Sequence, residues 1–350
     1  MTVSVIQKMA MNLFLVLSLV AATTANASNY GDRVGKLPNA VTAQLAKANA
    51  PDASGAIGRN RKGYFHVRFQ RGMHHVADHA LATKQVDAVD RFLTAVEYSL
   101  QRQLPSGDFE LVVPNELRDQ GKPSIADRAS GVAFFASSLG LGLHALETND
   151  WFQTSPDCKG LRSRLSTIKP RLRITLSFLI EHERYLEAAD QQAPNRLLFD
   201  AIAYITLGKL LNDDAAAKIG STFVDKALDQ IDPIDGYFVE GGGFDSSYNG
   251  VATALAIRLL MLEHRNDKLE SICLRAIRWQ KDRIFTSGEI STEGNSRVRP
   301  GQSGESFLGR EKDVDVGHTV EALMLASHQF SSREYIELTT LVVEYYSKGR

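Results

Sequence analysis

The sequence Asp235-Gly-Tyr-Phe-Val-Glu-Gly-Gly-Gly-Phe-Asp-Ser-Ser-Tyr-Asn249 connects two segments that have the apolar periodicity of helices. Its three consecutive glycines permit backbone paths that residues with side chains resist. Loops at the start of a helix on a rigid scaffold often carry polar chemistry. We therefore expect a functional site here, with four candidate residues: Glu240, Asp245, Tyr248 and Asn249.

Helical periodicity extends from this loop over most of the chain. No run of alternating residues indicates a strand. Ser124, Asp213 and the pair Ser246-Ser247 have the residue types of helix starts. The sequence therefore predicts an all-α protein. Apolar residues recur at three- and four-residue spacing within 86–103, 130–147, 160–188, 196–211, 214–231, 247–264, 268–284, 314–330 and 332–347.

A weak internal repeat suggests how these helices are arranged. At Gly107, Gly236 and Gly288 a helical segment ends in a glycine kink, and a polar loop and a helix rich in small residues follow. The second and third kinks are 52 residues apart, the length of one helical hairpin with a long loop. Hairpins of this size must stack to bury their faces. We expect five to six of them in an incomplete barrel, an α/α toroid, with an irregular right-handed superhelix as the alternative.

The first 27 residues have the features of a secretory signal peptide. Lys8 is their only charge, the segment 9–22 is apolar, and Ala25-Asn26-Ala27 fits a cleavage site. No later apolar segment reaches the length of a membrane span. Removing one lysine and no acid takes the formal charge from -1 to -2, which argues against nucleic acid as a partner. We expect a periplasmic or secreted protein whose residues 28–350 form one domain. The sequence does not determine its oligomeric state.

Two further features leave alternatives open. Cys158 and Cys273 permit one disulfide or two buried thiols. The basic segment 59–79 interleaves arginines with aromatic residues, which suits subsites for an acidic glycan. Within it, His75 and His79 have the spacing of two metal ligands on one helix face, but a solvated helix start explains them better. We expect no metal and no cofactor.

Two segments together resemble the toroid domain of polysaccharide lyases of the alginate lyase and heparinase II/III kind. The segment from Pro194 to Ala203 is similar to the helix start where those lyases carry an Asn-His pair. The opening segment is similar to their Asp-Gly…Glu…Ser-x-x-Tyr-His stretch. Asn195 and Tyr248 are 53 residues apart, about the family spacing, whereas Arg196 and Asn249 stand where the family has histidines. The resemblance covers about residues 125–330 and implies the toroid.

The same resemblance implies cleavage of a uronate-containing polysaccharide by β-elimination. In this reaction a base removes the proton next to the sugar carboxylate, an acid protonates the leaving oxygen, and a third group neutralises the carboxylate. We expect Tyr248 to act as base, acid or both, once cations lower its ordinary pKa of about 10. Asn195 would donate to the carboxylate, and Arg196 would bind the anionic sugar. His318 is expected at the same opening.

A second polar loop, 286–312, adds substrate-binding candidates: Glu293, Asn295 and Arg297. Structural roles compete with the catalytic ones, since Tyr248 also suits a half-buried aromatic and Asn195 a helix cap. Two other functions stay open. One is glycoside hydrolysis by a carboxylate pair, and the other is glycan binding or export assistance without catalysis. The carboxylate candidates for hydrolysis are Asp127, Glu240, Asp245 and Glu293.

Overall fold

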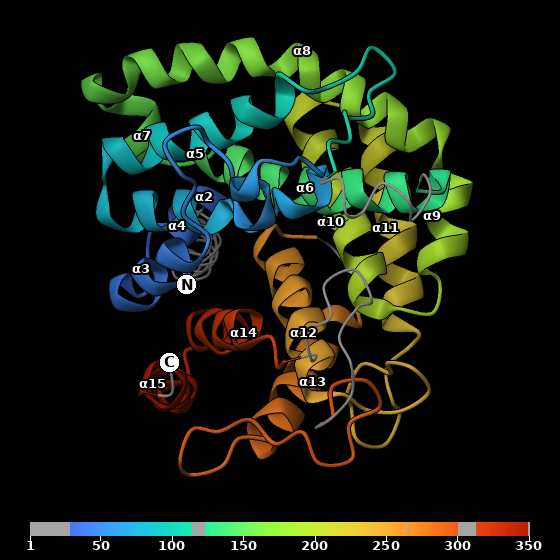
Figure 1. Cartoon of the computed structure of the whole chain (residues 1–350). Coiled ribbons are helices and arrows are strands. Elements are labelled where there is room, and N and C mark those ends of the chain that lie inside the picture. Colours follow the sequence, from blue (N-terminus) through green and yellow to red (C-terminus); the bar gives the residue numbers. More distant parts are fainter. Residues whose placement is uncertain (1–28, 114–122, 265, 300–312, 349–350) are drawn as a thin grey trace, which may run out of the picture.

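The protein is mostly helical (Figure 1). The computed structural model describes residues 29–113, 123–264, 266–299 and 313–348, so the predicted signal peptide at 1–27 lies outside the described residues. Within these ranges, extended structure is limited to isolated two-residue bridges. The all-α prediction is confirmed.

The described helices match the predicted segments closely. Each predicted segment has a helical counterpart, although 160–188 is divided at His182. The sequence missed four helices, namely α2, α3, α4 and α7. In chain order the helices are α2 (Tyr30–Val34), α3 (Asn39–Ala48), α4 (His74–Thr83), α5 (Val86–Leu100), α6 (Ile125–Glu147), α7 (Asp150–Thr154), α8 (Lys159–Glu181), α9 (Glu183–Asp190), α10 (Pro194–Leu211), α11 (Asp214–Leu228), α12 (Ser246–Met261), α13 (Leu269–Asp282), α14 (Val316–Gln329) and α15 (Arg333–Lys348), with short 3-10 helices η1 (Gly58–Lys62), η2 (Val67–Phe69) and η4 (Pro156–Cys158).

Two of the three predicted helix starts are confirmed. Ser124 caps α6 in a reciprocal capping box with Asp127, and Asp213 caps α11. The third prediction was wrong by one residue, because Asp245 caps α12 in place of the serine pair. A carboxylate oxygen accepts two backbone N–H groups there. The serine hydroxyls bond elsewhere, to the Ser291 carbonyl oxygen and the Asp315 N–H.

Five helices, α4, α6, α10, α12 and α14, form a consecutive series in which each contacts the next. Most of their residues are buried, as expected for helices covered on all sides. The amphipathic helices α5, α11, α13 and α15 each pack on the preceding member of that series, and α8 packs on α5, α6 and α10. Helix α14 also contacts α3. The chain therefore contains successive helix pairs in which a largely buried helix packs against an amphipathic one.

The predicted glycine kinks share one local structure. Gly107, Gly236 and Gly288 have φ of 91°, 85° and 92°, values that favour glycine. Each kink is closed by a single antiparallel bridge: Gln103 with Phe109, Ile231 with Phe238, and Ile284 with Ile290.

Each kink also packs on a helix that follows it in the chain. A Cβ added at Gly107 would lie 2.4 Å from the Ile174 carbonyl oxygen of α8, and one at Gly288 would lie 2.2 Å from the Leu341 carbonyl oxygen of α15. A fourth kink follows α3, where Gly55 has φ of 96° and abuts the Thr94 carbonyl oxygen of α5. The sequence analysis did not include it, although Ile57 follows Gly55 by two residues, as Phe109 follows Gly107. The repeat therefore includes one more glycine kink than the sequence indicated.

Helix α6 is, among the described residues, the one helix long and apolar enough to cross a membrane by length and composition. The expectation that no later segment reaches this length was wrong. Of its most apolar window, 94% is buried inside the protein, as in the core helix of a soluble protein. Close packing explains the burial, since a Cβ at Gly142 would lie 2.4 Å from the Phe92 ring.

Both cysteines are buried free thiols. Cys158 lies in η4 and Cys273 lies in α13. Of the two alternatives that the sequence left open, the structure has the unpaired one.

Candidate functional site

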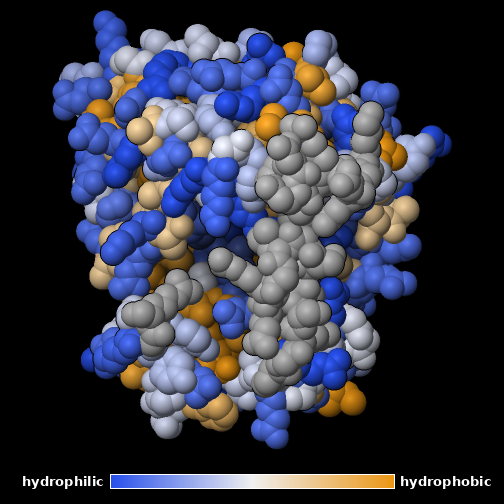
Figure 2. All heavy atoms as spheres, viewed as in Figure 1, coloured by the Kyte–Doolittle hydropathy of each residue, from blue (hydrophilic) through white to orange (hydrophobic). Residues whose placement is uncertain are grey.

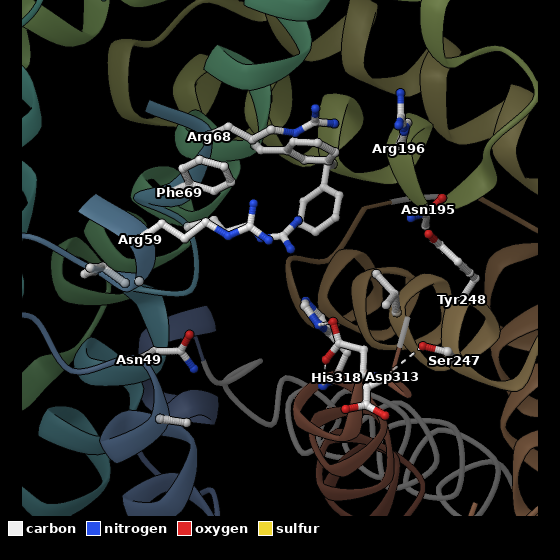
Figure 3. Close-up of a pocket in the computed structure, with 18 of the residues that line it drawn as sticks. Asn49, Arg59, Arg68, Phe69, Asn195, Arg196, Ser247, Tyr248, Asp313 and His318 are labelled. Carbon is white, nitrogen blue, oxygen red and sulfur yellow. Dashed lines mark hydrogen bonds and ion pairs between the residues drawn. The ribbon is translucent and has the colours of Figure 1, made fainter. Parts of the chain in front are cut away.

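A pocket of about 380 Å³ lies where the first turns of α10, α12 and α14 face the segment that contains η1 and η2 (Figure 3). Figure 2 shows that this face of the molecule is mainly hydrophilic and is hollowed near its centre. The residues that line the pocket are Ala48, Asn49, Ile57, Gly58, Arg59, Arg68, Phe69, Arg71, Phe134, Asn195, Arg196, Phe199, Ser247, Tyr248, Val251, Val298, Asp313, Asp315 and His318.

Helix α10 contributes Asn195 and Arg196 from its first turn. The Asn195 side chain is nearly buried, and its Oδ1 has no hydrogen-bond partner within the described ranges. Arg196 Nη1 lies 3.0 Å from Oδ1 of the buried Asp190. Burial opposes the charge of Arg196, but Asp190 and, more weakly, Tyr248 and Glu240 raise the pKa of its guanidinium above the usual value. Arg196 is therefore a permanent cation in the pocket.

Helix α12 contributes Tyr248, which is half-buried. The guanidinium carbon of Arg297 lies 5.4 Å from the centre of its ring, a cation–π contact. Arg297 Nη1 also donates to Oε1 of the buried Glu240 at 2.8 Å. Arg196 and Arg297, from different parts of the chain, thus both interact with Tyr248. Such cations stabilise the charged form of a phenol.

Asp245 holds the two segments beside Tyr248 together. Its Oδ1 accepts the N–H groups of Ser247 and Tyr248 at 3.0 and 3.1 Å. Its Oδ2 accepts those of Arg297 and Val298 at 2.9 and 2.7 Å. The side chain is fully buried, so this carboxylate joins the start of α12 to the loop that carries Arg297.

Asn295 and Asn249 are also buried and bonded within the protein. Asn295 accepts the Ser246 N–H at 2.9 Å and donates to the Val298 carbonyl oxygen at 3.1 Å. Asn249 accepts the Phe238 N–H at 3.0 Å and donates to Gln280 Oε1 at 2.9 Å. Both side chains support the backbone behind the pocket.

Helix α14 contributes His318, whose Nδ1 lies 2.9 Å from Oδ2 of Asp315. Asp315 also caps the helix, because its Oδ1 accepts the His318 N–H at 3.1 Å. Burial alone would lower the pKa of His318, but Asp315 raises it above the usual value, and His318 in turn lowers the pKa of Asp315. Because Asp315 engages Nδ1, Nε2 is the ring nitrogen left for a ligand. The sequence prediction missed Asp315, although an aspartate three residues before a histidine at a helix start was a readable signal.

The opposite side of the pocket is an arginine wall formed by Arg59, Arg68 and Arg71. The guanidinium carbons of Arg68 and Arg71 lie 4.7 and 5.7 Å from the centre of the Phe134 ring. Figure 3 shows Arg59 and Arg68 extending toward the pocket from the side opposite Asn195 and Tyr248. With Arg196, four of the lining residues are arginines, against two aspartates, one of them bonded to His318.

The structure therefore brings together part of the predicted set. Four candidates line the pocket: Asn195, Arg196, Tyr248 and His318. Arg297 and Glu240 adjoin Tyr248, whereas Asp245, Asn249 and Asn295 lie behind it. Glu293 is exposed and does not line the pocket. The basic segment 59–79, which the sequence suggested as a glycan subsite, contains the three residues of the arginine wall.

Comparisons of this chain with family models, with curated proteins and with solved structures found no match. The conclusions about the site therefore depend on its geometry and chemistry.

Proposed function

We propose that the hairpins close into an incomplete α/α toroid. The proposal is supported by the consecutive contacts from α4 to α14 and by the contact between α14 and α3. The four glycine kinks add support, because each lies against the outer helix that follows it. In such a ring the starts of the inner helices share one end, and the pocket lies at the starts of α10, α12 and α14.

We propose that this pocket binds and cleaves an acidic, uronate-containing polysaccharide, outside the cell or in the periplasm. The observation that carries the proposal is the meeting of Tyr248, Asn195, Arg196 and His318 in one pocket lined by arginines. The first turns of three helices lie there, and the N-terminal end of a helix attracts anions through its partial positive charge. Both features favour a ligand with carboxylate groups.

The reaction proposed for this site is β-elimination. Arg196 and Asn195 hold the sugar carboxylate and neutralise its charge, which acidifies the neighbouring C–H group. Tyr248, as a phenolate beside Arg196 and Arg297, removes that proton. The C–H electron pair forms a carbon–carbon double bond, the glycosidic C–O bond breaks, and the leaving oxygen takes a proton. His318, kept protonated by Asp315, supplies this proton, or the tyrosine returns its own.

The test measures the ultraviolet absorbance of the unsaturated sugar on alginate, pectate and glycosaminoglycans. Tyr248→Phe keeps the ring beside Arg297 but removes the hydroxyl, so we expect kcat to fall by about 10²–10⁴-fold. Tyr185→Phe is the matched control, because Tyr185 is exposed on α9 and we expect no loss there. Full activity in Tyr248→Phe, or no product from any substrate, would refute the proposal.

Hydrolysis and simple binding are outcomes of the same experiment. A hydrolase would release reducing ends without the new absorbance, and Glu240→Gln would abolish them. None of its carboxylate candidates lines the pocket among the described residues, which weighs against it. A binding protein would show affinity for acidic oligosaccharides with neither product.

A further inference from the structure

A cluster of charged and polar side chains is buried among α4, α12 and α14. It contains His74, His75 and Asp78 of α4, Arg258 of α12 and Glu321 of α14. Each is at most 5% exposed. Residues of these types are rarely buried unless they have a specific partner. The reaction proposed above does not use them.

The charged and polar groups of the cluster contact one another. Arg258 Nη2 lies 2.5 Å from Asp78 Oδ2 and 2.8 Å from Glu321 Oε1, so one guanidinium serves two carboxylates. Glu321 also faces both imidazoles, with Oε1 3.4 Å from His74 Nε2 and Oε2 3.6 Å from His75 Nε2. Buried groups of this kind are stable only when each has a suitable partner.

Two polar atoms of the cluster lack hydrogen-bond partners in the described part of the chain. They are His75 Nδ1 and Asp78 Oδ1, both buried. A buried polar atom without a partner usually has a bound water or ion beside it. His74, His75 and Asp78 each offer a ligand atom such that the three atoms lie within 4.8 Å of one another. Two imidazole nitrogens and a carboxylate oxygen are donors that borderline metal ions prefer.

The neighbours of these three residues have the arrangement of outer partners around a metal site. His75 Nε2 lies 3.6 Å from Glu321 Oε2, which leaves Nδ1 as its ligand atom. Both ring nitrogens of His74 have neighbours, since Nδ1 lies 3.0 Å from Ser138 Oγ and Nε2 lies 3.4 Å from Glu321 Oε1. An ion bound through Nε2 would displace the longer of these two contacts. Arg258 occupies the other oxygen of Asp78. Such partners fix the tautomer and orientation of metal-binding side chains.

We propose that His74, His75 and Asp78 bind one divalent transition-metal ion, such as Zn²⁺, at a buried structural site where α4 faces α12 and α14. The ion gives His75 Nδ1 and Asp78 Oδ1 the partner that they lack and holds α4 beside the Arg258–Glu321 pair. The sequence spacing had suggested His75 and His79, a different pair, as possible metal ligands. His79, however, lies outside the cluster and bonds Thr42 Oγ1 at 3.2 Å. The proposal is independent of the reaction proposed for the pocket.

The first test measures metal in tag-free protein purified without added metal, by elemental mass spectrometry. We expect about one equivalent per chain. A chelator should lower the melting temperature, and Zn²⁺ or Co²⁺ should restore it. Bound Co²⁺ should also show the visible absorption of a site with nitrogen and oxygen ligands.

The second test compares two substitutions on one helix. His75→Gln should weaken Co²⁺ binding by at least tenfold, since it removes a ligand, whereas His79→Gln should leave binding unchanged. Metal-free wild-type protein whose melting temperature does not respond to Zn²⁺, Co²⁺, Ni²⁺ or Mn²⁺ would overturn the proposal. This wild-type measurement decides the question even when His75→Gln fails to fold. Equal loss in both variants would also overturn it.

Discussion

At the scale of single residues, Asp315 determines the charge of His318. The imidazole lies partly buried at the pocket, where burial favours its neutral form, and the carboxylate at 2.9 Å outweighs this effect. A histidine with a raised pKa keeps its proton at a pH closer to neutral, so a larger fraction is available to protonate a leaving oxygen. This interaction has chemical consequences beyond capping a helix.

We predict that Asp315→Asn lowers the pKa of His318. In the wild type the charged imidazole contributes stability that is complete below its unfolded pKa of about 6.5 and is lost as pH rises through the higher folded pKa. In the variant this contribution should vanish. NMR titration of the histidines measures the pKa directly, with His144 as an internal reference whose pKa burial lowers to about 4. An unchanged titration of His318 would contradict the assignment.

Asp200 is a buried carboxyl group beside the Asp190–Arg196 pair. Neither of its oxygens has a hydrogen-bond partner among the described residues. Burial and then Asp190 raise its pKa well above the usual value. Its protonated form therefore suits the fold, and its contribution to stability declines as pH rises above the unfolded pKa of about 3.9.

We predict that Asp200→Asn stabilises the protein at pH 8 by roughly 1–2 kcal/mol, because the amide cannot ionise. The advantage over wild type should shrink as pH falls toward 4, where Asp200 is protonated. Urea unfolding at several pH values measures this difference. Asp229→Asn is the control, since that side chain is 71% exposed and should show no such trend.

At the scale of elements, Asp245 organises the start of α12 and the loop beside it. Its substitution by alanine would leave four backbone N–H groups without their acceptor. We predict a loss of about 2–4 kcal/mol for Asp245→Ala, measured by urea unfolding. The matched control is Asp213→Ala on α11, where one N–H group loses its acceptor and about 1 kcal/mol is expected. Equal losses would show that the three additional hydrogen bonds of Asp245 add nothing.

The glycine kinks make a separate prediction. Gly288→Ala should cost at least about 2 kcal/mol, because φ is 92° and the new Cβ would lie 2.2 Å from the Leu341 carbonyl oxygen. Gly160→Ala in α8 has open space around the new Cβ and should instead stabilise by up to about 1 kcal/mol. Thermal unfolding of both variants gives the comparison. A harmless Gly288→Ala would mean that the kink does not constrain the packing.

Elements were predictable where the apolar spacing was regular. The long core helices α6, α10 and α12 followed from it. Helix α4 was missed because three of its buried residues, His74, His75 and Asp78, are polar and interrupt the apolar pattern. Their burial depends on Arg258 and Glu321, which lie far away in the sequence, so no local rule reveals it.

At the scale of the whole molecule, the pocket combines helix starts with arginines from distant segments. We predict that raising NaCl from 50 to 500 mM weakens the binding of an acidic oligosaccharide roughly tenfold, because salt screens these charges. Calorimetry with the Tyr248→Phe variant separates binding from cleavage. A neutral oligosaccharide of the same length is the control and should show little affinity at either concentration.

The sequence predicted which loops carry polar residues, but it did not show which side chains enter the pocket. Tyr248 and Asn249 are neighbours, yet one lines the pocket and the other bonds Phe238 and Gln280 behind it. That difference depends on the rotation of α12 against α13. The arginine wall comes from a segment far from α12 in the sequence. Its contacts with Phe134 form only in the folded chain and could not be predicted from local sequence.

Each glycine kink is covered by a helix that comes later in the chain, never by an earlier one. A fragment that stops before α15 would leave the backbone around Gly288 with nothing to cover it. We therefore expect a chain still under synthesis to leave this backbone open to water until α15 has emerged from the ribosome.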